Sequence, residues 1–545
     1  MFPYLAAFWL LRTTKFVLFY LYLWQLKEYH LGRFFDHFRT EKGKGLLWNP
    51  VEFLKILILA FFFIFPYYFS SSSYGFSIFS ILPWAILILF AAESLKALRD
   101  IFQKNLKLPA GTKKTVLLAL ILLSLEGMVI FSLLHFEKDL DFFAFWLLLL
   151  DVFTFIIVSA VVLLFQPIAV LIKYQTIRKA RQKIQEHKDL LIIGITGSYG
   201  KSSTKEFLYT LLSQKPGLEG KVLKTKENQN SEAGISQCIL NDLTKDHKIF
   251  IVEMGAYGKG GIKLLCNIAK PHIGILTGVN EQHQSLFGSQ KTIMKTKYEL
   301  IESLPENGLA VFNGSDKNCF ELYKKTQKPR KLLVSLKQNG SDLWAESIIS
   351  RKNFVFFKAC DNTGCNGFKI YVPGSHFVQN LLSAILVAKE CGMDMEEIVT
   401  ASLKIRAGEK TMQVLIGQKG ITVIDDSYSA NPASVFSALE YLKIFHTKKI
   451  IVLPSLIELG GSSKKIHEEI GRKIGEVCDA AIVTTKDRFK EIKIGALDAG
   501  FEENSIFFSE KPKEITETIK KSLGPEDVVL LEGRVSEEII KLLTR

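Results

Sequence analysis

The hydrophobic positions of this chain change their pattern near residue 173. Before it, apolar residues form long uninterrupted runs, and beyond it they form short runs between amphipathic stretches. A helix needs roughly 20 apolar residues to cross a bilayer, and four runs supply about that number: Phe53–Phe69, Phe76–Ala92, Thr115–Leu134 and Phe142–Ile172. The pattern therefore predicts a transmembrane helical region over residues 1–175, followed by soluble α/β domains built of βα units with a parallel sheet.

A fifth run, Phe2–Trp24, is weaker because it carries Arg12 and Lys15 in its middle. It could span, lie in the interface or act as an uncleaved signal-anchor, and we expect it to span, which gives four to five spans. Glu126 and Asp151 also lie inside predicted spans, where an acid is a functional hypothesis. The simpler interpretation, which we favour, is a helix-to-helix hydrogen bond.

The connecting segments alternate in charge. Segments 25–50, 96–114 and 173–183 are basic, whereas 70–75 has no basic residue and 137–141 is mainly acidic. Because Lys and Arg stay on the cytoplasmic side, the N-terminus is expected outside and everything after residue 173 inside, where ATP is available. The sequence thus predicts a multi-pass cell-membrane protein with cytoplasmic soluble domains.

Composition agrees with a two-part chain. Of 545 residues, 48% are hydrophobic and 23% are charged, which is too apolar for an ordinary soluble enzyme and too charged for a pure membrane protein. The net charge of +14 lies largely beside the spans, so membrane lipids are expected partners and nucleic acid is not. The seven scattered cysteines, of which Cys360 and Cys365 are the nearest pair, predict no disulfide or metal framework and a reducing compartment.

The first soluble strand, Leu190–Thr196, runs directly into a glycine loop, 197–203, and then into the helical stretch Thr204–Leu212. This order suits a phosphate cradle, in which Lys201 reaches the terminal phosphates and Ser202 ligates Mg²⁺. The common loop has four residues between its glycines, whereas this one has two. On its own, the short form is also compatible with an incidental loop.

Two later strands end in metal-ligand residue types. Phe250–Glu253 ends in its glutamate, and Ile273–Val279 is followed by His283. The carboxyl ends of strands in open α/β sheets are where ligands bind. Alone, either residue would more often be structural, but beside a phosphate loop both become plausible Mg²⁺ ligands.

Together these stretches resemble the Mur ligases, and most closely their MurF branch, which joins D-alanyl-D-alanine to UDP-N-acetylmuramoyl-tripeptide. The similar motifs occur in family order over residues 190–545: TGSYGKSSTKE at 196–206, EMGA at 253–256, HQSLFGS at 283–289, TKYEL at 296–300, PGSHFVQNLLSA at 373–384, DDSYSANPAS at 425–434 and ELG at 458–460.

The resemblance implies the residues of an ATP and Mg²⁺ site. Its phosphate-binding residues are Gly197, Ser198, Gly200, Lys201, Ser202 and Ser203. Ser202 and Glu253 would hold one Mg²⁺ and His283 a second, and His376 and Asn380 would bracket the adenine. Lys297 would be carbamylated by CO₂, which makes it an oxygen ligand for Mg²⁺. Lys295 is its nearby rival, although the Lys-x-Glu-Leu spacing favours Lys297.

The implied reaction is phosphoryl transfer from ATP to a carboxylate, followed by attack of an amine on the acyl phosphate. In this reaction no protein side chain needs to act as a nucleophile. Catalysis would rest on charge neutralisation and alignment by Lys201, His283 and Lys297.

The expected soluble organisation is a basic linker over 176–188, a P-loop ATPase domain over 189–408 that corresponds to the Mur ligase central domain, and a C-terminal Rossmann-like domain over 409–545. The last rests on predicted strands at 421–424, 449–453, 480–484 and 527–531. The resemblance would put the second substrate near Asp426, Tyr428 and Asn431. Asp and Asn before Pro432 could equally well just begin a helix.

Departures from the family pattern concern the substrates more than the chemistry. Predicted spans occupy the place of a soluble UDP-sugar domain, and four motifs differ: Thr277-Gly278 for Thr-Asn, Lys410-Thr411-Met412 for Gly-Arg-Met, Pro454-Ser455-Leu456 for Gly-Asp-Met, and Glu532-Gly533-Arg534 for Lys-Gly-Ser.

The expected function is therefore an ATP-dependent amide ligase of peptidoglycan-precursor synthesis, adding D-Ala-D-Ala or a similar amino acid or dipeptide to a UDP-muramoyl-peptide-like cell-wall precursor. The alternatives are a lipid-linked or other cell-envelope acceptor, or a non-catalytic membrane scaffold that kept the fold. An ATP-driven transporter is disfavoured, because the strand at 250–253 ends in a single glutamate followed by Met-Gly rather than in Asp-Glu.

Overall fold

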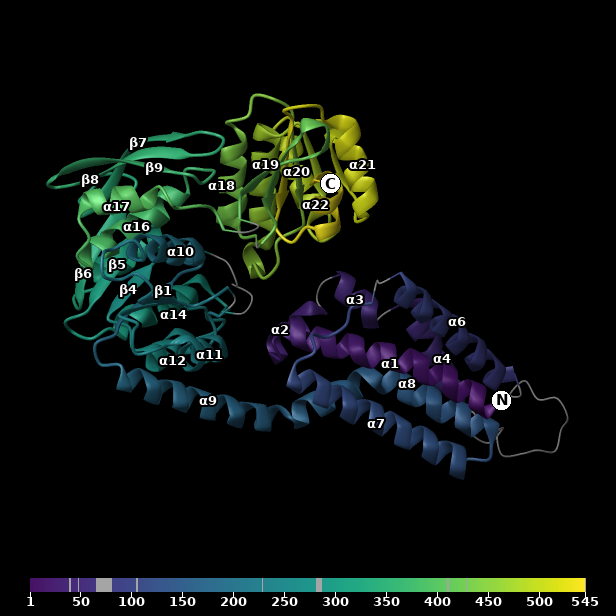
Figure 1. Cartoon of the computed structure of the whole chain (residues 1–545). Helices are drawn as coiled ribbons and strands as arrows, with labels where there is room; N and C mark the ends of the chain where they lie inside the picture. The colour runs from purple at the N-terminus through teal and green to yellow at the C-terminus, as the bar shows by residue number, and fades with distance from the viewer. Residues whose placement is uncertain are drawn as a thin grey trace. The chain divides into compact units, whose positions relative to one another are not determined.

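The computed structural model describes residues 1–38, 41–47, 49–64, 81–103, 106–227, 229–280, 287–408, 411–428 and 430–544. The chain forms two compact units, Met1–Ile172 and Lys173–Arg545 (Figure 1). Each unit has its own hydrophobic core, so the division expected from the sequence is also a division in space.

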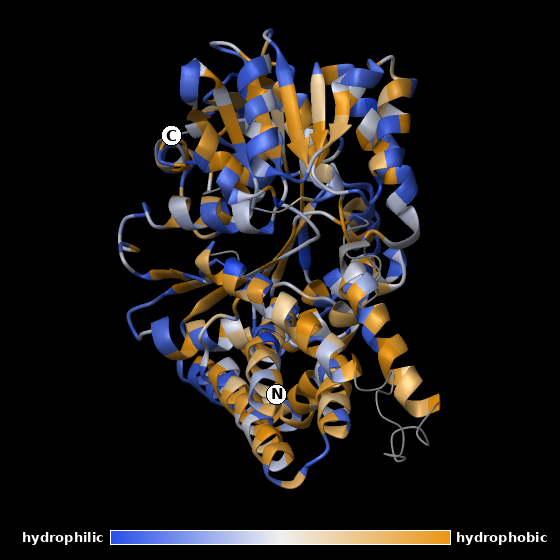
Figure 2. Ribbon diagram, turned by 90° about the vertical axis from the view of Figure 1, so that its right-hand side faces the viewer, coloured by the Kyte–Doolittle hydropathy of each residue, from blue (hydrophilic) through white to orange (hydrophobic). Residues whose placement is uncertain are grey.

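The first unit is helical, and its helices are largely hydrophobic along their length (Figure 2). They are α1 (Phe2–Leu26), α2 (Leu31–His37), α3 (Glu41–Leu47), α4 (Pro50–Ile64), α6 (Leu82–Phe102), α7 (Lys113–Phe136) and α8 (Leu140–Leu164). Among the described residues, three segments are long and apolar enough to cross a membrane: Phe2–Leu26, Lys113–Phe136 and Leu140–Glu186. Residues 65–80, which complete two of the predicted spans, lie outside the described part of the chain.

The predicted span Phe142–Ile172 lies within the apolar segment Leu140–Glu186, which is divided between two helices. Helix α8 ends at Leu164, and a separate helix, α9 (Gln166–Glu186), begins two residues later. Pro167 explains the break, because it has no backbone N–H to continue α8 but is tolerated in the first turn of a new helix. Most of the segment predicted as a linker, 176–188, is the second half of α9.

The second unit begins with a nine-stranded sheet of order β2-β3-β1-β4-β5-β6-β7-β8-β9. Its strands are β1 (Leu191–Thr196), β2 (Val222–Lys224), β3 (Ile249–Glu253), β4 (Ile273–Leu276), β5 (Leu309–Asn313), β6 (Arg330–Ser335), β7 (Leu343–Ser350), β8 (Val355–Asp361) and β9 (Gly364–Ile370). The predicted parallel arrangement holds from β2 to β7. It is wrong for β7, β8 and β9, which pair antiparallel because only short connections join them.

Helices cover both faces of this sheet. Helices α10 (Lys201–Leu212), α16 (Phe377–Glu390) and α17 (Met395–Ser402) contribute to the core on one face. The other face packs against α9, α11 (Glu232–Asp242), α12 (Gly261–Ala269), α14 (Gln290–Glu302) and α15 (Lys317–Lys325). The carboxyl ends of the parallel strands stay uncovered by these layers and carry the loops of the candidate site.

A six-stranded sheet of order β10-β11-β15-β12-β13-β14 follows, parallel except for β10. Its strands are β10 (Gln413–Ile416), β11 (Thr422–Asp426), β12 (Lys449–Leu453), β13 (Ala480–Val483), β14 (Ile506–Phe508) and β15 (Val528–Glu532). Its helices are α18 (Pro432–Leu442), α19 (Ser463–Val477), α20 (Phe489–Asp498), α21 (Pro512–Ser522) and α22 (Glu537–Thr544). All four predicted strands are present, and the domain is Rossmann-like as expected.

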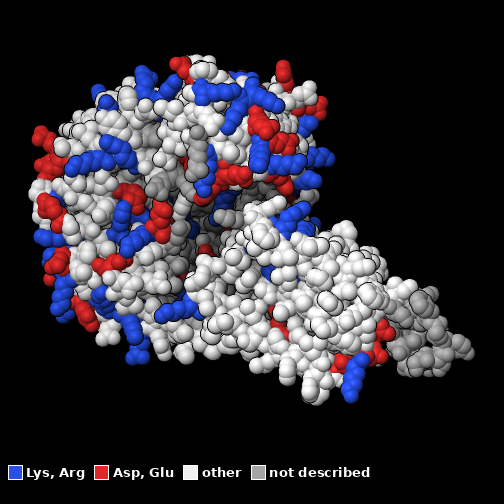
Figure 3. Space-filling view, turned by 45° about the vertical axis from the view of Figure 1, so that its right-hand side comes forward, with Lys and Arg blue, Asp and Glu red and all other residues white. Residues whose placement is uncertain are grey.

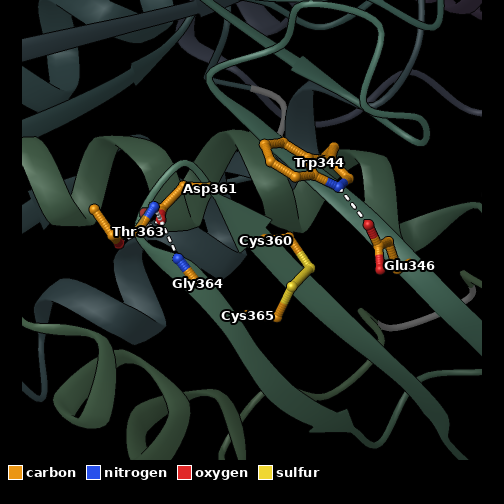
Figure 4. Close-up of a disulfide and its surroundings, with 7 residues drawn as sticks. All are labelled: Trp344, Glu346, Cys360, Asp361, Thr363, Gly364 and Cys365. Atoms are coloured by element: carbon orange, nitrogen blue, oxygen red, sulfur yellow. Dashed lines mark hydrogen bonds between the residues drawn. A yellow bond between two sulfur atoms is a disulfide. The ribbon is translucent and has the colours of Figure 1, made fainter.

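The expectation that the cysteines form no disulfide is wrong at one place. Cys360 and Cys365 lie directly opposite each other on β8 and β9 and are joined by a disulfide (Figure 4). The hairpin between β8 and β9 brings them together, and that hairpin was not among the sequence predictions. The five other cysteines are free thiols.

Candidate nucleotide and metal site

The glycine loop between β1 and α10 is compact. Helix α10 begins at Lys201, so its first backbone N–H groups face the space above the loop, as an anion site requires. Gly200 has a φ of +77°, and a Cβ placed there would lie 2.4 Å from Oδ1 of Asn380. Only glycine fits this position, because both the backbone conformation and the approach of Asn380 exclude a side chain.

Lys201 lies across the loop that it follows. Its Nζ donates hydrogen bonds to the carbonyl oxygens of Gly197, at 2.9 Å, and of Ser198, at 3.3 Å. Burial lowers the pKa of this lysine, and the negative charge of Glu253 opposes that effect. The ammonium is thus held where phosphate oxygens above the loop would meet it.

Glu253, at the end of β3, is buried, and both oxygens of its carboxylate accept hydrogen bonds from side chains. Ser202 Oγ donates to its Oε2 at 2.9 Å, and Asn230 Nδ2 donates to its Oε1 at 3.1 Å. Burial alone would raise the pKa of this carboxyl, but the charges of Lys205 and Lys201 and the two hydrogen bonds outweigh burial and hold it below the ordinary value. An ionised carboxylate beside a serine hydroxyl offers the hard oxygen ligands that suit Mg²⁺.

Sequence reasoning missed two of these partners. Lys205 is buried with its Nζ 3.3 Å from Glu253 Oε2, and Asn230 comes from the loop after β2. Lys205 could have been found, because it follows Lys201 by four residues and so lies on the same face of α10. Asn230 carried no comparable signal.

Lys297, on α14, is only 4% exposed, whereas Lys295 is exposed. Burial lowers the pKa of Lys297 to about 7, with a further contribution from the positive charge of Lys201 and an opposing one from Glu299. Glu299 is itself occupied, because its carboxylate accepts hydrogen bonds from the backbone N–H groups of Gly260, at 2.7 Å, and Lys263, at 2.9 Å. The geometry therefore distinguishes Lys297 from its neighbouring rival.

The other residues of the central domain that were predicted to bind the nucleotide or the metal lie in different environments. His283 lies in 281–286, outside the described residues, and stays a prediction. Asn380 is buried against Gly200, while His376 is half-buried at the start of α16, where burial lowers its pKa to about 4 and keeps the ring neutral. Ser198 Oγ accepts a hydrogen bond from the backbone N–H of Asn280, and Ser203 lies half-buried in the first turn of α10.

One departure from the family pattern has a structural explanation. A Cβ on Gly278 would lie 2.2 Å from Cζ of Tyr199. The phenol of Tyr199 in turn donates a 2.8 Å hydrogen bond to Oδ2 of Asp316, which fixes the ring in place. The glycine at 278 therefore makes room for the tyrosine of the phosphate loop.

The three predicted substrate residues of the C-terminal domain have unlike surroundings. Asp426 is buried at the end of β11, accepts a hydrogen bond from the Met412 backbone N–H at 3.0 Å, and pairs in register with Glu532. Asn431 caps α18, so the helix-start interpretation describes its present contacts. Tyr428 is 38% exposed and is the most accessible of the three.

Fold and site together define a P-loop nucleotide-binding protein of two successive α/β domains. Residues 195–388 match the Mur ligase middle domain, and residues 412–535 match the Mur ligase glutamate ligase domain. The chain belongs to the Mur ligase family.

Its relatives include UDP-N-acetylmuramoyl-tripeptide--D-alanyl-D-alanine ligases. The Bacillus subtilis enzyme is 27% identical over 358 residues, which are 64% of this chain and 75% of the relative. The Mycobacterium tuberculosis enzyme is 34% identical over 294 residues, 52% of this chain and 56% of the relative, so the match spans little more than half of that protein. Among solved structures, the Thermotoga maritima MurF ligase in complex with ADP has a TM-score of 0.60 and 26% identity, and the match covers 68% of this chain and 83% of that one.

Proposed function

We propose that this protein is an ATP- and Mg²⁺-dependent ligase of the MurF type, which joins D-alanyl-D-alanine or a similar amine to a UDP-muramoyl-peptide-like carboxylate. The observation that carries the proposal is the convergence of Lys201, Ser202 and Glu253 at the carboxyl ends of β1 and β3. The relatives named for this reaction support the substrate class.

The residues around the loop suit an acyl-phosphate reaction. ATP would supply the phosphoryl group, and Mg²⁺ would neutralise its charge. The backbone amides at the start of α10 hold phosphate oxygens, Lys201 gives its positive charge to them, and Ser202 and Glu253 offer the metal its oxygen ligands. Asn380, which packs on the loop, and the neutral ring of His376 would bracket the adenine in this proposal.

The surroundings of Lys297 support its carbamylation. With a pKa of about 7, a large fraction of this amine is neutral near physiological pH, and only a neutral amine can attack CO₂. The nitrogen lone pair forms the N–C bond, one C=O electron pair moves to oxygen, and the nitrogen loses a proton to water. The product is an anion, which the nearby charge of Lys201 favours. A carbamate oxygen would serve Mg²⁺ together with Glu253 and the predicted ligand His283.

An apolar helical unit precedes the two domains that match the family. Its presence favours the variant of this function in which the acceptor is lipid-linked or another component of the cell envelope. A lipid-linked or other cell-envelope acceptor would be presented at the membrane, where this unit is expected to lie. The non-catalytic scaffold is disfavoured, because Lys201, Ser202, Glu253 and Lys297 are all retained.

The directions of the helices support a multi-pass topology. Phe2 at the start of α1 contacts Phe143 near the start of α8, with ring centroids 4.8 Å apart, and Trp24 near the end of α1 donates to Ser159 at 3.2 Å. Helices α1 and α8 therefore run parallel, as two outside-to-inside crossings would. Helix α4 runs against α8, since Lys55 contacts Asp151 and Phe62 contacts Phe145.

Membrane lipids are proposed as partners of this unit. In Figure 3 the surface formed by its helices is mostly free of charged side chains, in contrast to the blue and red surface of the soluble domains. Helix α9, which follows directly, is rich in Lys and Arg, and such a segment beside a span attracts anionic headgroups.

The deciding experiment incubates the purified full-length protein with ATP, Mg²⁺, UDP-muramoyl-tripeptide and D-alanyl-D-alanine, and follows phosphate release and product mass. Formation of the ligated product supports the MurF-type function. Product only with a lipid-linked acceptor supports the variant, and ATP-independent or absent ligation with every pair contradicts the proposal.

A further inference from the structure

The first unit contains a cluster of five charged side chains from four helices. Arg12 of α1 forms ion pairs with Glu52 of α4, at 3.1 Å, and with Glu93 of α6 and Asp151 of α8. Lys55 of α4 forms ion pairs with the same three carboxylates, at distances of 3.1 Å to Glu52, 2.8 Å to Glu93 and 3.0 Å to Asp151. Each cation thus contacts every carboxylate of the cluster.

This cluster lies midway along α1 and α8, between two separate hydrophobic cores. On α1, Arg12 falls between Trp9, which belongs to one core, and Val17, which belongs to the other. On α8, Asp151 falls between Leu148 and Val158 in the same way. At 1.5 Å per residue, both ends of α1 and α8 are about 15–20 Å away from the cluster. On α4, Glu52 and Lys55 lie within the first two turns, and Glu93 of α6 follows directly after the predicted span Phe76–Ala92. The cluster is therefore expected near the cytoplasmic ends of the predicted α4 and α6 spans.

The charges in the cluster do not balance. Two cations face three carboxylates, which leaves one negative charge in excess where a net charge is strongly disfavoured. The neighbouring groups of the described helices do not supply the missing positive charge. Lys15 is already paired with Asp100 at 2.7 Å, Lys96 and Arg99 of α6 are exposed, and Glu126 of α7 is a further acid.

We propose that the cluster is a buried proton-binding site, in which one exchangeable proton is shared among Glu52, Glu93 and Asp151. A proton neutralises the excess charge and needs no additional space among side chains that already touch. Glu52 and Glu93 each have 18% of their side chain exposed, whereas Asp151 has none, so the proton exchanges with solvent through the two glutamates. Its loss would leave a net charge among α1, α4, α6 and α8 and weaken their packing, which makes this unit responsive to pH independently of the ligase activity.

The test uses full-length protein in lipid nanodiscs, with Glu126→Gln and Glu532→Gln together as the reference background, so that neither of these other acids holds a proton. Infrared spectra at neutral pH should show the carbonyl band of a protonated carboxylic acid in the reference. Glu93→Gln should lose that band, because the variant cluster is neutral without a proton. Glu52→Gln should do the same and covers the case in which Glu93→Gln fails to fold.

Thermal unfolding against pH gives the second measurement. Where the folded protein binds one proton more than the unfolded chain, the equilibrium constant of unfolding increases about tenfold for each unit by which the pH rises. The reference should lose stability as pH rises above the ordinary carboxyl range, and both glutamine variants should lose less stability over the same pH range. Glu137→Gln, in the turn between α7 and α8, is the matched control and should behave like the reference.

Three results would overturn the proposal. The first is a reference protein with no protonated-acid band at neutral pH. The second is a band and a pH profile that persist unchanged in both Glu93→Gln and Glu52→Gln. The third is recovery of stability at high pH on adding sodium ions, which would make a metal cation, and not a proton, the occupant.

Discussion

At the residue scale, Lys201 carries the simplest expectation. Lys201→Ala removes the point charge that faces the phosphates, and loss of one such electrostatic contact in a preorganised site costs about 100-fold or more in turnover. ATP turnover of the variant should therefore be nearly abolished, while its thermal unfolding and its membrane fraction match the wild type. Near-normal turnover would remove the phosphate-cradle assignment.

Lys297 makes the sharper chemical claim. Lys297→Ala should still bind ATP but transfer its phosphoryl group poorly, because the metal would lack the oxygen ligand proposed for the carbamylated lysine. Added acetate should restore part of the activity by filling the vacated space with a carboxylate. The exposed Lys295 offers the matched control, since Lys295→Ala should keep full activity.

Two outcomes would show that this assignment is wrong. Rescue of Lys297→Ala by a small amine instead of a carboxylate would mean that the residue acts through its ammonium. Full activity in Lys297→Ala, with loss in Lys295→Ala, would mean that the neighbouring lysine is the functional one.

At the scale of elements, the ends of β11 and β15 place two carboxyl groups in one buried site. Burial and the neighbouring charge of Asp426 raise the pKa of Glu532 well above its ordinary value, and burial raises the pKa of Asp426 to about 6. Ser434 Oγ donates to Glu532 at 3.2 Å, which ties the pair to α18. The two acids therefore hold a proton between them at moderate pH.

Glu532→Gln should raise the stability of the protein at neutral pH. In the unfolded chain Glu532 has the pKa of an ordinary glutamate, which is about 4.3. The folded protein binds the extra proton above that pH, so stability falls as pH rises from there to the raised pKa. Glutamine keeps a donor toward Asp426 without any proton to lose, and thermal unfolding from pH 4 to about 8 should show a smaller decline.

The exposed Glu538 on α22 provides the control for that series. Glu538→Gln makes the same chemical change outside the pair and should leave the pH profile unaltered. A Glu532→Gln variant whose profile follows the wild type at every pH would show that the pair does not hold the proton.

At the scale of the whole molecule, the alternation of basic segments predicts that the C-terminus lies in the cytoplasm, and the parallel course of α1 and α8 agrees with that topology. A tag added after Arg545 should resist protease in intact cells and be cleaved once the cells are opened. A tag inserted before Phe2 should show the reverse behaviour. Cleavage of the C-terminal tag in intact cells would contradict the topology and separate the ligase from ATP.

Much of this protein is already determined by its sequence. The division near residue 173, the glycine loop after β1 and the four predicted strands of the C-terminal domain were all recognisable, because hydrophobic periodicity and a backbone anion site are properties of short segments. The family motifs then ordered Lys201, Ser202, Glu253 and Lys297 into one expected site.

Only the tertiary structure decided which distant residues meet and how deeply each is buried. It joined Asp151 to Arg12 and Lys55, where a single helix-to-helix hydrogen bond was expected, and it placed Lys205 and Asn230 on Glu253. It paired Gly278 with Tyr199 and Cys360 with Cys365. The physical reason is common to all of these: contact and burial depend on how whole helices and strands pack, so the pKa of Lys297 and the charge balance of the helical cluster exist only in the assembled fold.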